Sequence, residues 1–395
     1  MRLAVISSGF PCGRREPYLA TELAALRPLV AYLAVAPLRP NGRPLEAYEN
    51  AVLPSTGEIV RDALAATLRA PKACAGALAD VALSPKTVRA KLKNLYIFAR
   101  ALALAQRFHR DGVEHVHAYW LSTPATAAYV IGRVNAIPWS STAHRWDIFE
   151  NNMIARKVES AQFVRVISER GRAALAAYAP GHEKKTTVVR LGTALQDPPA
   201  VQASRSSVRL LCAAAFVATK GHADLLQAFA QAHAQHPQLE LTLAGAGPLQ
   251  ASLLRRARTM RCAASIEFRG YVRREGLLRE LAAGHYDAVV LSSRDDGVRE
   301  MEGVPSILIE ASSLGVASIA TRSGAVEELL DEESAFLAQP QNVQSLAHAI
   351  SEATDAAARA ARARRALERT RNLHDPAQTA ARIAGLIAGA TGEAA

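Results

Sequence analysis

The sequence predicts an α/β protein with two domains, each built around a doubly wound parallel β-sheet. Its 395 residues exceed one ordinary hydrophobic core and fit two domains of roughly 150–200 residues. Short β-rich runs alternate with longer helical patterns in both halves, which is typical of parallel sheets covered by helices. A Pro-rich, polar segment at 196–204 separates the halves and cannot continue either type of element.

Each half contains its own candidate strands. In the first half they are Arg2–Ser7, Val30–Ala36, Val113–His117, Ile137–Thr142, Phe163–Ile167 and Thr187–Val189. In the second half they are Val208–Ala213, Leu239–Ala244, Ser265–Phe268, Asp287–Leu291 and Ala317–Thr321. We therefore expect an N-terminal domain over 1–197, a C-terminal domain over 205–372, and a last helix within 373–395 that packs back toward the N-terminal domain.

Composition excludes several protein classes. Half of the residues are hydrophobic and no low-complexity tract occurs, which excludes disordered and fibrous proteins. The apolar start at 1–6 is too short for a signal peptide, and no run approaches the roughly 20 apolar residues that span a bilayer. The four cysteines have neither disulfide-framework nor zinc-ligand spacing. We expect a cytoplasmic protein with no bound metal.

The net charge of +11 indicates an anionic partner or surface. The stretch Val81–Arg110 lacks acidic residues and interleaves basic with apolar side chains at helical spacing. We expect a basic amphipathic helix over 84–110, which either lies on an anionic membrane face or is an ordinary surface helix. A second basic cluster, Arg359–Arg371, reads as a solvated helix face. No nucleic-acid module accompanies this charge, so we expect no nucleic-acid partner.

The strongest motif lies in the second half, where Glu302 and Glu310 bracket a Gly-Val-Pro turn. Pro305 suits the first turn of a helix, whose free N–H groups are suited to hold a diphosphate. The apolar neighbours of Glu310 indicate that its carboxylate needs a buried partner. Two partners fit: a ribose or sugar hydroxyl pair, or a cation of the same domain.

This motif resembles the E-x7-E element of the retaining glycosyltransferases of family 4. Their GT-B architecture has two Rossmann-like domains facing across a cleft, and the match is closest to the exopolysaccharide, or colanic-acid-type, branch. The resemblance implies that Glu302 lies by the donor sugar and that Glu310 binds the donor ribose. It also implies donor binding by Gly303, Val304, Pro305 and Ser306.

Four further segments match the same family in order and spacing. Lys220-Gly221 resembles the lysine-glycine segment that meets the donor diphosphate, and Gly245 and Gly247 resemble its glycine turn. Val272 falls in the segment that lines the base, and Ser323–Glu328 falls where the family has a Gly-Gly-x-x-Glu turn. One position departs from the pattern, because Ala215 stands where the family commonly has a diphosphate-binding arginine. We expect another cation to substitute, with Arg190, Arg294 and Arg299 as the candidates.

The first half resembles the acceptor side of the same branch. Gly9, Phe10 and Glu16 lie in the turn-rich loop after the first strand, and Asp147 belongs to a Thr-Ala-His-x-x-Asp-Ile run after another strand. By the resemblance, His144 of that run lies at the reaction centre near the donor sugar. Taken alone, a single histidine is more often a core or capping residue.

The resemblance implies a sugar transfer with retention, in which His144, Glu302 and Lys220 are the catalytic residues. The nucleotide-sugar is a substrate, so we expect no cofactor, and no Asp-x-Asp motif is placed to hold an obligatory metal. We expect a glycan or polyprenyl-linked acceptor at the inner face of the plasma membrane, in surface or exopolysaccharide biosynthesis. Two alternatives stay open: a nucleotide-sugar epimerase of the same fold, and a non-catalytic module that binds nucleotide or glycan.

Overall fold

The computed structural model describes residues 1–9, 17–39, 52, 54–85, 87–194, 206–296 and 303–389. Two compact units make up the chain. Unit 1 runs from Met1 to Gly192 and resumes at Pro376, whereas unit 2 runs from Thr193 to Asp375. None of the described helices is long and apolar enough to cross a bilayer.

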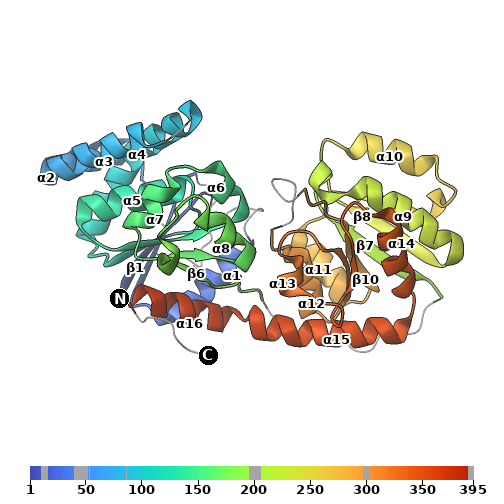
Figure 1. The fold of residues 1–395 in the computed structure, drawn as a ribbon. Coiled ribbons are helices and arrows are strands. Elements are labelled where there is room, and N and C mark those ends of the chain that lie inside the picture. The colour runs from blue at the N-terminus through green and yellow to red at the C-terminus, as the bar shows by residue number, and fades with distance from the viewer. Residues whose placement is uncertain are drawn as a thin grey trace. The chain divides into compact units, whose positions relative to one another are not determined.

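Unit 1 contains a six-stranded parallel sheet, in which the strands follow the order β2-β1-β3-β4-β5-β6 (Figure 1). The strands are β1 (Arg2–Ser7), β2 (Tyr32–Pro37), β3 (His115–Ala118), β4 (Trp139–Ala143), β5 (Val164–Val166) and β6 (Thr186–Val188). The order reverses between β1 and β3. Ligands of open α/β sheets bind beyond the carboxyl ends of the strands at such a reversal.

Helices cover both faces of this sheet, and successive β1 side chains accordingly pack into two different cores. Leu3 and Val5 pack with α1, whereas Ala4 and Ile6 pack in the core that includes α4 and α5. The helices are α1 (Pro17–Leu26), α2 (Thr56–Arg69), α3 (Pro71–Leu83), α4 (Val88–Arg110), α5 (Thr123–Asn135), α6 (Arg145–Glu150), α7 (Ile154–Ser160), α8 (Glu169–Ala176) and α16 (Pro376–Ile387), with 3-10 turns η1 (Arg27–Leu29) and η2 (Glu183–Lys185).

The helix α16 comes from the far end of the sequence and packs beside α1 in unit 1 (Figure 1). Its Ala380 and Ile383 are buried in the same core as Leu19 and Leu23 of α1. The side chain of Gln162 also donates a hydrogen bond to the Leu386 carbonyl at 3.0 Å. These contacts tie the end of the described chain to the first domain core.

Unit 2 contains a second six-stranded parallel sheet, of order β12-β11-β10-β7-β8-β9, with the reversal between β10 and β7. Its strands are β7 (Val208–Ala213), β8 (Leu239–Ala244), β9 (Ile266–Gly270), β10 (Ala288–Leu291), β11 (Ala317–Thr321) and β12 (Phe336–Ala338). Leu210 and Cys212 of β7 face one core and Leu211 faces another. Both units therefore have the predicted doubly wound α/β fold.

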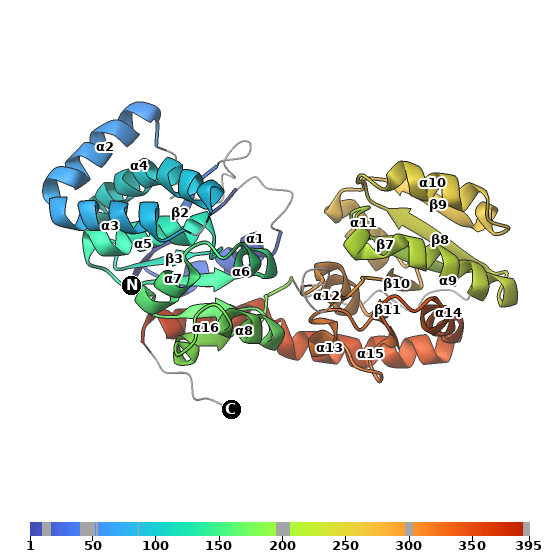
Figure 2. The ribbon, with the colours of Figure 1, turned by 45° about the horizontal axis from the view of Figure 1, so that its top comes forward.

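Helices cover the unit 2 sheet on both sides (Figure 2). They are α9 (His222–Gln235), α10 (Gln250–Arg258), α11 (Arg274–Ala282), α12 (Ser306–Ser313), α13 (Val326–Leu329), α14 (Val343–Glu352) and α15 (Ala356–Leu373), with 3-10 turns η3 (Ala218–Lys220) and η4 (Ala263–Ser265).

The basic helix expected over 84–110 is present as α4, but it begins at Val88, four residues later than predicted. Pro85 explains this later start, since proline lacks the N–H that a helix interior needs. Thr87 instead caps α4, accepting a hydrogen bond from the Ala90 N–H at 3.2 Å.

Candidate functional site

The loops that follow β7 and β8 interlock at the carboxyl edge of the unit 2 sheet. The Phe216 N–H donates to the Ala246 carbonyl at 3.0 Å, and the Leu249 N–H donates back to the Phe216 carbonyl at 3.1 Å. A Cβ atom on Gly245 would lie 2.0 Å from the Ala214 carbonyl oxygen, and one on Gly247 would lie 2.5 Å from the Phe216 carbonyl oxygen. Only glycine fits these two close approaches, so the predicted glycine turn has a clear steric cause.

Lys220 ends η3, directly before α9, and its surroundings are tightly fixed. Gly221 follows at a φ of +61°, and a Cβ atom there would lie 2.0 Å from the Ser292 carbonyl oxygen. The Ser292 hydroxyl donates to the Lys220 carbonyl at 3.0 Å. Lys220 therefore lies between the start of a helix and the loop after β10, where a helix N-terminus and an ammonium group both favour an anion.

Arg294 lies next to Lys220. Its backbone N–H donates to the Thr219 carbonyl at 2.8 Å, and its Cγ atom is 3.5 Å from the position that a Cβ atom on Gly221 would take. Of the other two candidate substitutes for the missing arginine, Arg190 belongs to unit 1 and Arg299 lies outside the described residues. Arg294 is thus the candidate whose contacts within unit 2 bring it to the lysine segment.

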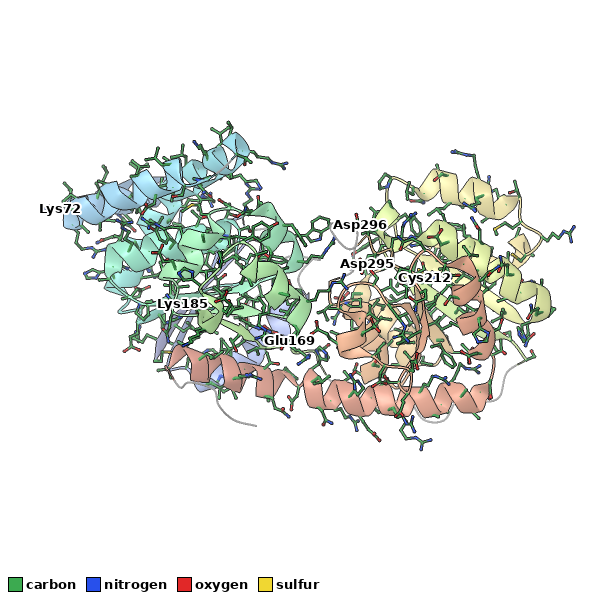
Figure 3. All side chains as sticks on the ribbon, viewed as in Figure 1. Lys72, Glu169, Lys185, Cys212, Asp295 and Asp296 are labelled. Atoms are coloured by element: carbon green, nitrogen blue, oxygen red, sulfur yellow. The ribbon has the colours of Figure 1, made fainter. Side chains whose placement is uncertain are left out.

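The loop after β10 is held by the turn after β11. Asp295, labelled with Asp296 in Figure 3, accepts a hydrogen bond from the Gly324 N–H at 2.8 Å. The Ser323 hydroxyl donates to the Arg294 carbonyl at 2.7 Å. The predicted Ser-Gly turn therefore packs against the loop that carries Arg294. Within the described residues, no cluster of three or more His, Cys, Asp or Glu side chains is arranged to hold a metal ion.

Glu310 is buried on α12, and its partner is a cation of the same unit. Arg274, the first residue of α11, donates from Nε to Glu310 Oε1 at 2.7 Å. Burial raises the pKa of Glu310, and the neighbouring guanidinium acts in the opposite direction. Within the described part of the chain, Oε2 accepts no hydrogen bond. Of the two partners expected for Glu310, a sugar hydroxyl pair or a cation of the same domain, the structure shows the cation. It contacts one of the two carboxylate oxygens.

The residues around α12 are only partly described. Glu302 lies outside the described residues, whereas Gly303, Val304 and Pro305 lead into the helix. Pro305 is the N-cap residue and Ser306 opens the helix, one position later than the predicted proline start. Val272 follows β9 and packs, half-buried, in the core that contains α12.

In unit 1, His144 is buried among aromatic rings at the end of β4. Its ring centroid lies 4.1 Å from that of Trp120 and 5.5 Å from that of Tyr18. Burial, assisted by the charge of Arg165, lowers the pKa of His144 to about 3. Its Nε2 atom has no hydrogen-bond partner among the described residues. The imidazole is therefore neutral at ordinary pH and holds a buried polar atom that no described residue satisfies.

Asp147 is buried beside His144 and binds backbone groups. Its carboxylate accepts from the N–H of His144 at 2.7 Å and from the N–H of Leu121. Lys157, also buried, donates to the carbonyls of Leu121 and Ser122 at 2.8 and 2.7 Å. Burial raises the pKa of Asp147 to about 7 and lowers the pKa of Lys157 to about 7. Asp147 thus links the loops after β3 and β4.

Two other residues of the predicted acceptor side, Phe10 and Glu16, lie outside the described residues, and Gly9 is the last described residue before them. Sequence patterns did not reveal the buried ion pair between Glu22 and Arg165. Two guanidinium nitrogens of Arg165 donate to the Glu22 carboxylate at 2.7 and 2.8 Å. The same carboxylate accepts from the Gly192 N–H at 2.9 Å. This pair fixes the chain after β6, where the first segment of unit 1 ends.

Unit 2 matches a known family. Residues 198–370 match the family model of Glycosyl transferases group 1, which covers less than half of the chain and lies within unit 2. The chain is also 26% identical, over 146 residues, to a GDP-mannose-dependent monoacylated alpha-(1-6)-phosphatidylinositol monomannoside mannosyltransferase of Corynebacterium glutamicum. That match takes in 37% of this chain and 38% of the relative, so it spans little more than a third of the relative's length.

Solved structures resemble the chain over nearly its whole length. HepE of Anabaena, in complex with UDP, has a TM-score of 0.70 at 17% identity and covers 98% of this chain and 100% of that one. Sucrose-phosphate synthase of Thermosynechococcus elongatus has a TM-score of 0.69 at 17% identity, with coverages of 98% and 99%. At 17% identity, this structural similarity establishes the fold and not the function. The two-domain α/β architecture is that of the GT-B glycosyltransferases.

Proposed function

We propose that the protein is a glycosyltransferase that takes a sugar from a nucleotide-sugar donor held by unit 2. One observation carries this proposal: Lys220, Arg294 and the start of α9 lie together at one edge of the unit 2 sheet. The neighbouring loops approach each other so closely that only glycine fits at their turns. The cations and the helix N-terminus favour a diphosphate at this edge. The group 1 match covers the same unit.

The donor-binding roles that we propose follow this edge. Lys220 and Arg294 contact the diphosphate, with Arg294 in place of the arginine that Ala215 replaces. Glu310 binds the ribose hydroxyls through the oxygen that Arg274 leaves open. Val272, Gly245 and Gly247 lie by the nucleoside, and the segment Gly303–Ser306 lies by the phosphates and the donor sugar. Fixed N–H groups and cations that meet the leaving phosphate stabilise its developing charge.

For the transfer itself we propose retention, with Glu302 and His144 near the donor sugar. His144 is neutral because burial lowers its pKa to about 3, so it acts as a hydrogen-bonding group and not as a cation. On the acceptor side we propose Gly9, Phe10 and Glu16, with Asp147 positioning the His144 backbone. No cofactor and no obligatory metal enters this scheme.

We further propose a glycan or polyprenyl-linked glycan acceptor at the inner face of the plasma membrane, as in surface or exopolysaccharide biosynthesis. Supporting this, the Corynebacterium glutamicum relative is named for a phosphatidylinositol mannoside acceptor. The net charge of +11 also suits a reaction at an anionic surface. The protein would then be cytoplasmic and peripheral to the membrane.

An assay of nucleotide release tests this function. The protein is incubated with UDP-, GDP- and ADP-sugars, with and without a lipid-linked glycan acceptor, and free nucleotide and products are identified by chromatography and NMR. We expect one sugar donor to yield free nucleotide and a product with the donor's anomeric configuration. The variants Glu310→Gln and Arg294→Gln should lose at least about tenfold in rate, whereas Arg258→Gln, an exposed arginine of α10, should match the wild type.

Three results would contradict the proposal. A new nucleotide-sugar formed without free nucleotide would identify an epimerase. The absence of turnover together with the absence of nucleotide binding would indicate a non-catalytic module. An inverted product would contradict retention while leaving sugar transfer in place.

A further inference from the structure

The helices α2, α3 and α4 expose an apolar surface. Among the described residues, thirteen large hydrophobic side chains are exposed, and nine of them lie on these three helices. The nine, which we call the α2–α4 surface, are Val60, Leu64, Leu68, Leu78, Leu83, Val88, Leu92, Leu95 and Tyr96. Single exposed hydrophobic residues need no explanation, but a concentration of them indicates an interaction surface.

The spacing of these residues places them on defined helix faces. Val60, Leu64 and Leu68 follow one another at intervals of four along α2, and Val88, Leu92 and Tyr96 do so along α4. Side chains four apart lie on the same face of a helix. Other positions of α4, such as Ala90 and Ile97, are buried in the core. The helix α4 therefore has two apolar faces. One packs in the core of unit 1, and the other is exposed.

The three helices form a layer on one side of unit 1, with α5 between them and the sheet (Figures 1 and 2). Two exposed apolar side chains flank the connection between α3 and α4, since Leu83 is 76% and Val88 72% exposed. Lys72, labelled in Figure 3, lies at one end of this layer. Apolar and basic groups thus occupy the same outer layer.

The charge of α4 and of the segment before it favours an anionic partner. The stretch from Val81 to Arg110 contains no acidic residue. Lys93 pairs with Glu150 of α6, but Arg89, Lys91 and Lys72 have no ion-pair partner among the described residues. Two copies of such a surface would bring like charges together, which disfavours self-association. An anionic bilayer instead accepts apolar side chains below its headgroups and basic side chains at its phosphates.

We propose that the α2–α4 surface docks on an anionic lipid bilayer, with Leu83, Val88, Leu92 and Tyr96 inserted and with Arg89 and Lys91 at the lipid phosphates. This inference deepens the proposed function, because docking would bring the enzyme to a lipid-linked acceptor. Binding to a bilayer needs neither donor nor acceptor. Its failure is therefore distinguishable from a failure of sugar transfer.

Co-sedimentation with lipid vesicles tests the proposal. The full chain is mixed with vesicles of phosphatidylcholine alone or of phosphatidylcholine with phosphatidylglycerol, an anionic lipid that gives the vesicle a negative surface potential. We expect binding to the anionic vesicles that weakens as salt is raised. Leu92→Gln with Tyr96→Gln should weaken binding at least about tenfold. Arg89→Gln with Lys91→Gln should weaken it about fivefold for each charge removed.

Matched variants serve as controls. Leu29→Gln removes an exposed leucine outside the layer, and Arg255→Gln with Arg256→Gln removes two exposed arginines of α10. Both should bind vesicles like the wild type, and every variant should keep the circular dichroism spectrum and melting temperature of the wild type, which shows that it is folded. No binding to anionic vesicles, or equal binding to neutral ones, would overturn the proposal. A wild-type dimer in sedimentation that Leu92→Gln with Tyr96→Gln dissociates would identify a second copy as the partner and would also overturn it.

Discussion

Arg274 and Glu310 are 36 residues apart in the sequence, yet they form an ion pair between α11 and α12 of unit 2. A buried carboxylate next to apolar residues is costly unless it is paired. Arg274 provides that pairing with one oxygen and leaves the other available for a ligand. We therefore regard Arg274 as a positioning residue that keeps Glu310 ionised and oriented.

This role gives a prediction for the pH dependence of nucleotide binding. Burial raises the pKa of Glu310 and Arg274 opposes the rise, so removal of the guanidinium should raise this pKa further. If the ionised carboxylate binds the ribose, binding weakens as the pH falls through this pKa. In Arg274→Gln, the midpoint of that loss should move to higher pH. Titrations between pH 5 and 8 measure it.

Arg273→Gln is the matched control, because Arg273 is the exposed neighbour of Arg274 and makes no ion pair with a described residue. We expect its midpoint to equal that of the wild type. Identical midpoints in all three proteins would refute the positioning role of Arg274.

The sequence predicts the need for a partner of Glu310 but not the identity of that partner. The apolar neighbours of Glu310 indicate burial, whereas the choice of Arg274 depends on how α11 approaches α12. The same limit applies to Glu22 and Arg165, which pair across 143 residues of sequence. Local patterns show which side chains will be buried, and tertiary packing decides which of them meet.

At the scale of elements, the predicted strands Arg2–Ser7, Val208–Ala213, Leu239–Ala244 and Ala317–Thr321 coincide with β1, β7, β8 and β11. These strands are buried on both faces, and their apolar runs are therefore nearly continuous. The strand β12 was not predicted, because its three residues form an edge of the sheet and carry no period that a sequence window detects. The predicted start of α4 was four residues too early, although Pro85 marks the boundary.

The glycine turn after β8 allows a test at this scale. Gly245→Ala places a Cβ atom 2.0 Å from the backbone oxygen of Ala214, so either the β7 or the β8 loop must shift. We expect a loss of about 1–3 kcal/mol in the free energy of unfolding, with weaker nucleotide binding. Urea denaturation followed by fluorescence measures this loss.

Gly276→Ala is the control within the same unit. Gly276 lies in the helix α11, and the nearest atom to an added Cβ is Val272 Cγ1 at 4.0 Å. Alanine is the better helix former, so this variant should gain up to about 1 kcal/mol. Equal effects of the two substitutions would show that the close approach at Gly245 is unimportant.

At the scale of the whole molecule, the two units have separate cores and separate chemistry. Unit 2 gathers the groups suited to a diphosphate and a ribose. Unit 1 holds the neutral His144 beside Trp120 and carries the exposed α2–α4 surface. Donor binding should therefore depend on unit 2, whereas membrane docking should depend on unit 1.

The most direct test of the donor site is calorimetric titration of the protein with UDP, GDP, ADP and CMP. We expect one nucleotide to bind selectively. Glu310→Ala should weaken that binding about 10- to 100-fold, because a hydrogen bond to a charged group is lost. Glu368→Ala, an exposed glutamate of α15, should bind like the wild type. No binding to any of the four nucleotides, or equal binding by Glu310→Ala, would contradict a donor site at this edge of unit 2.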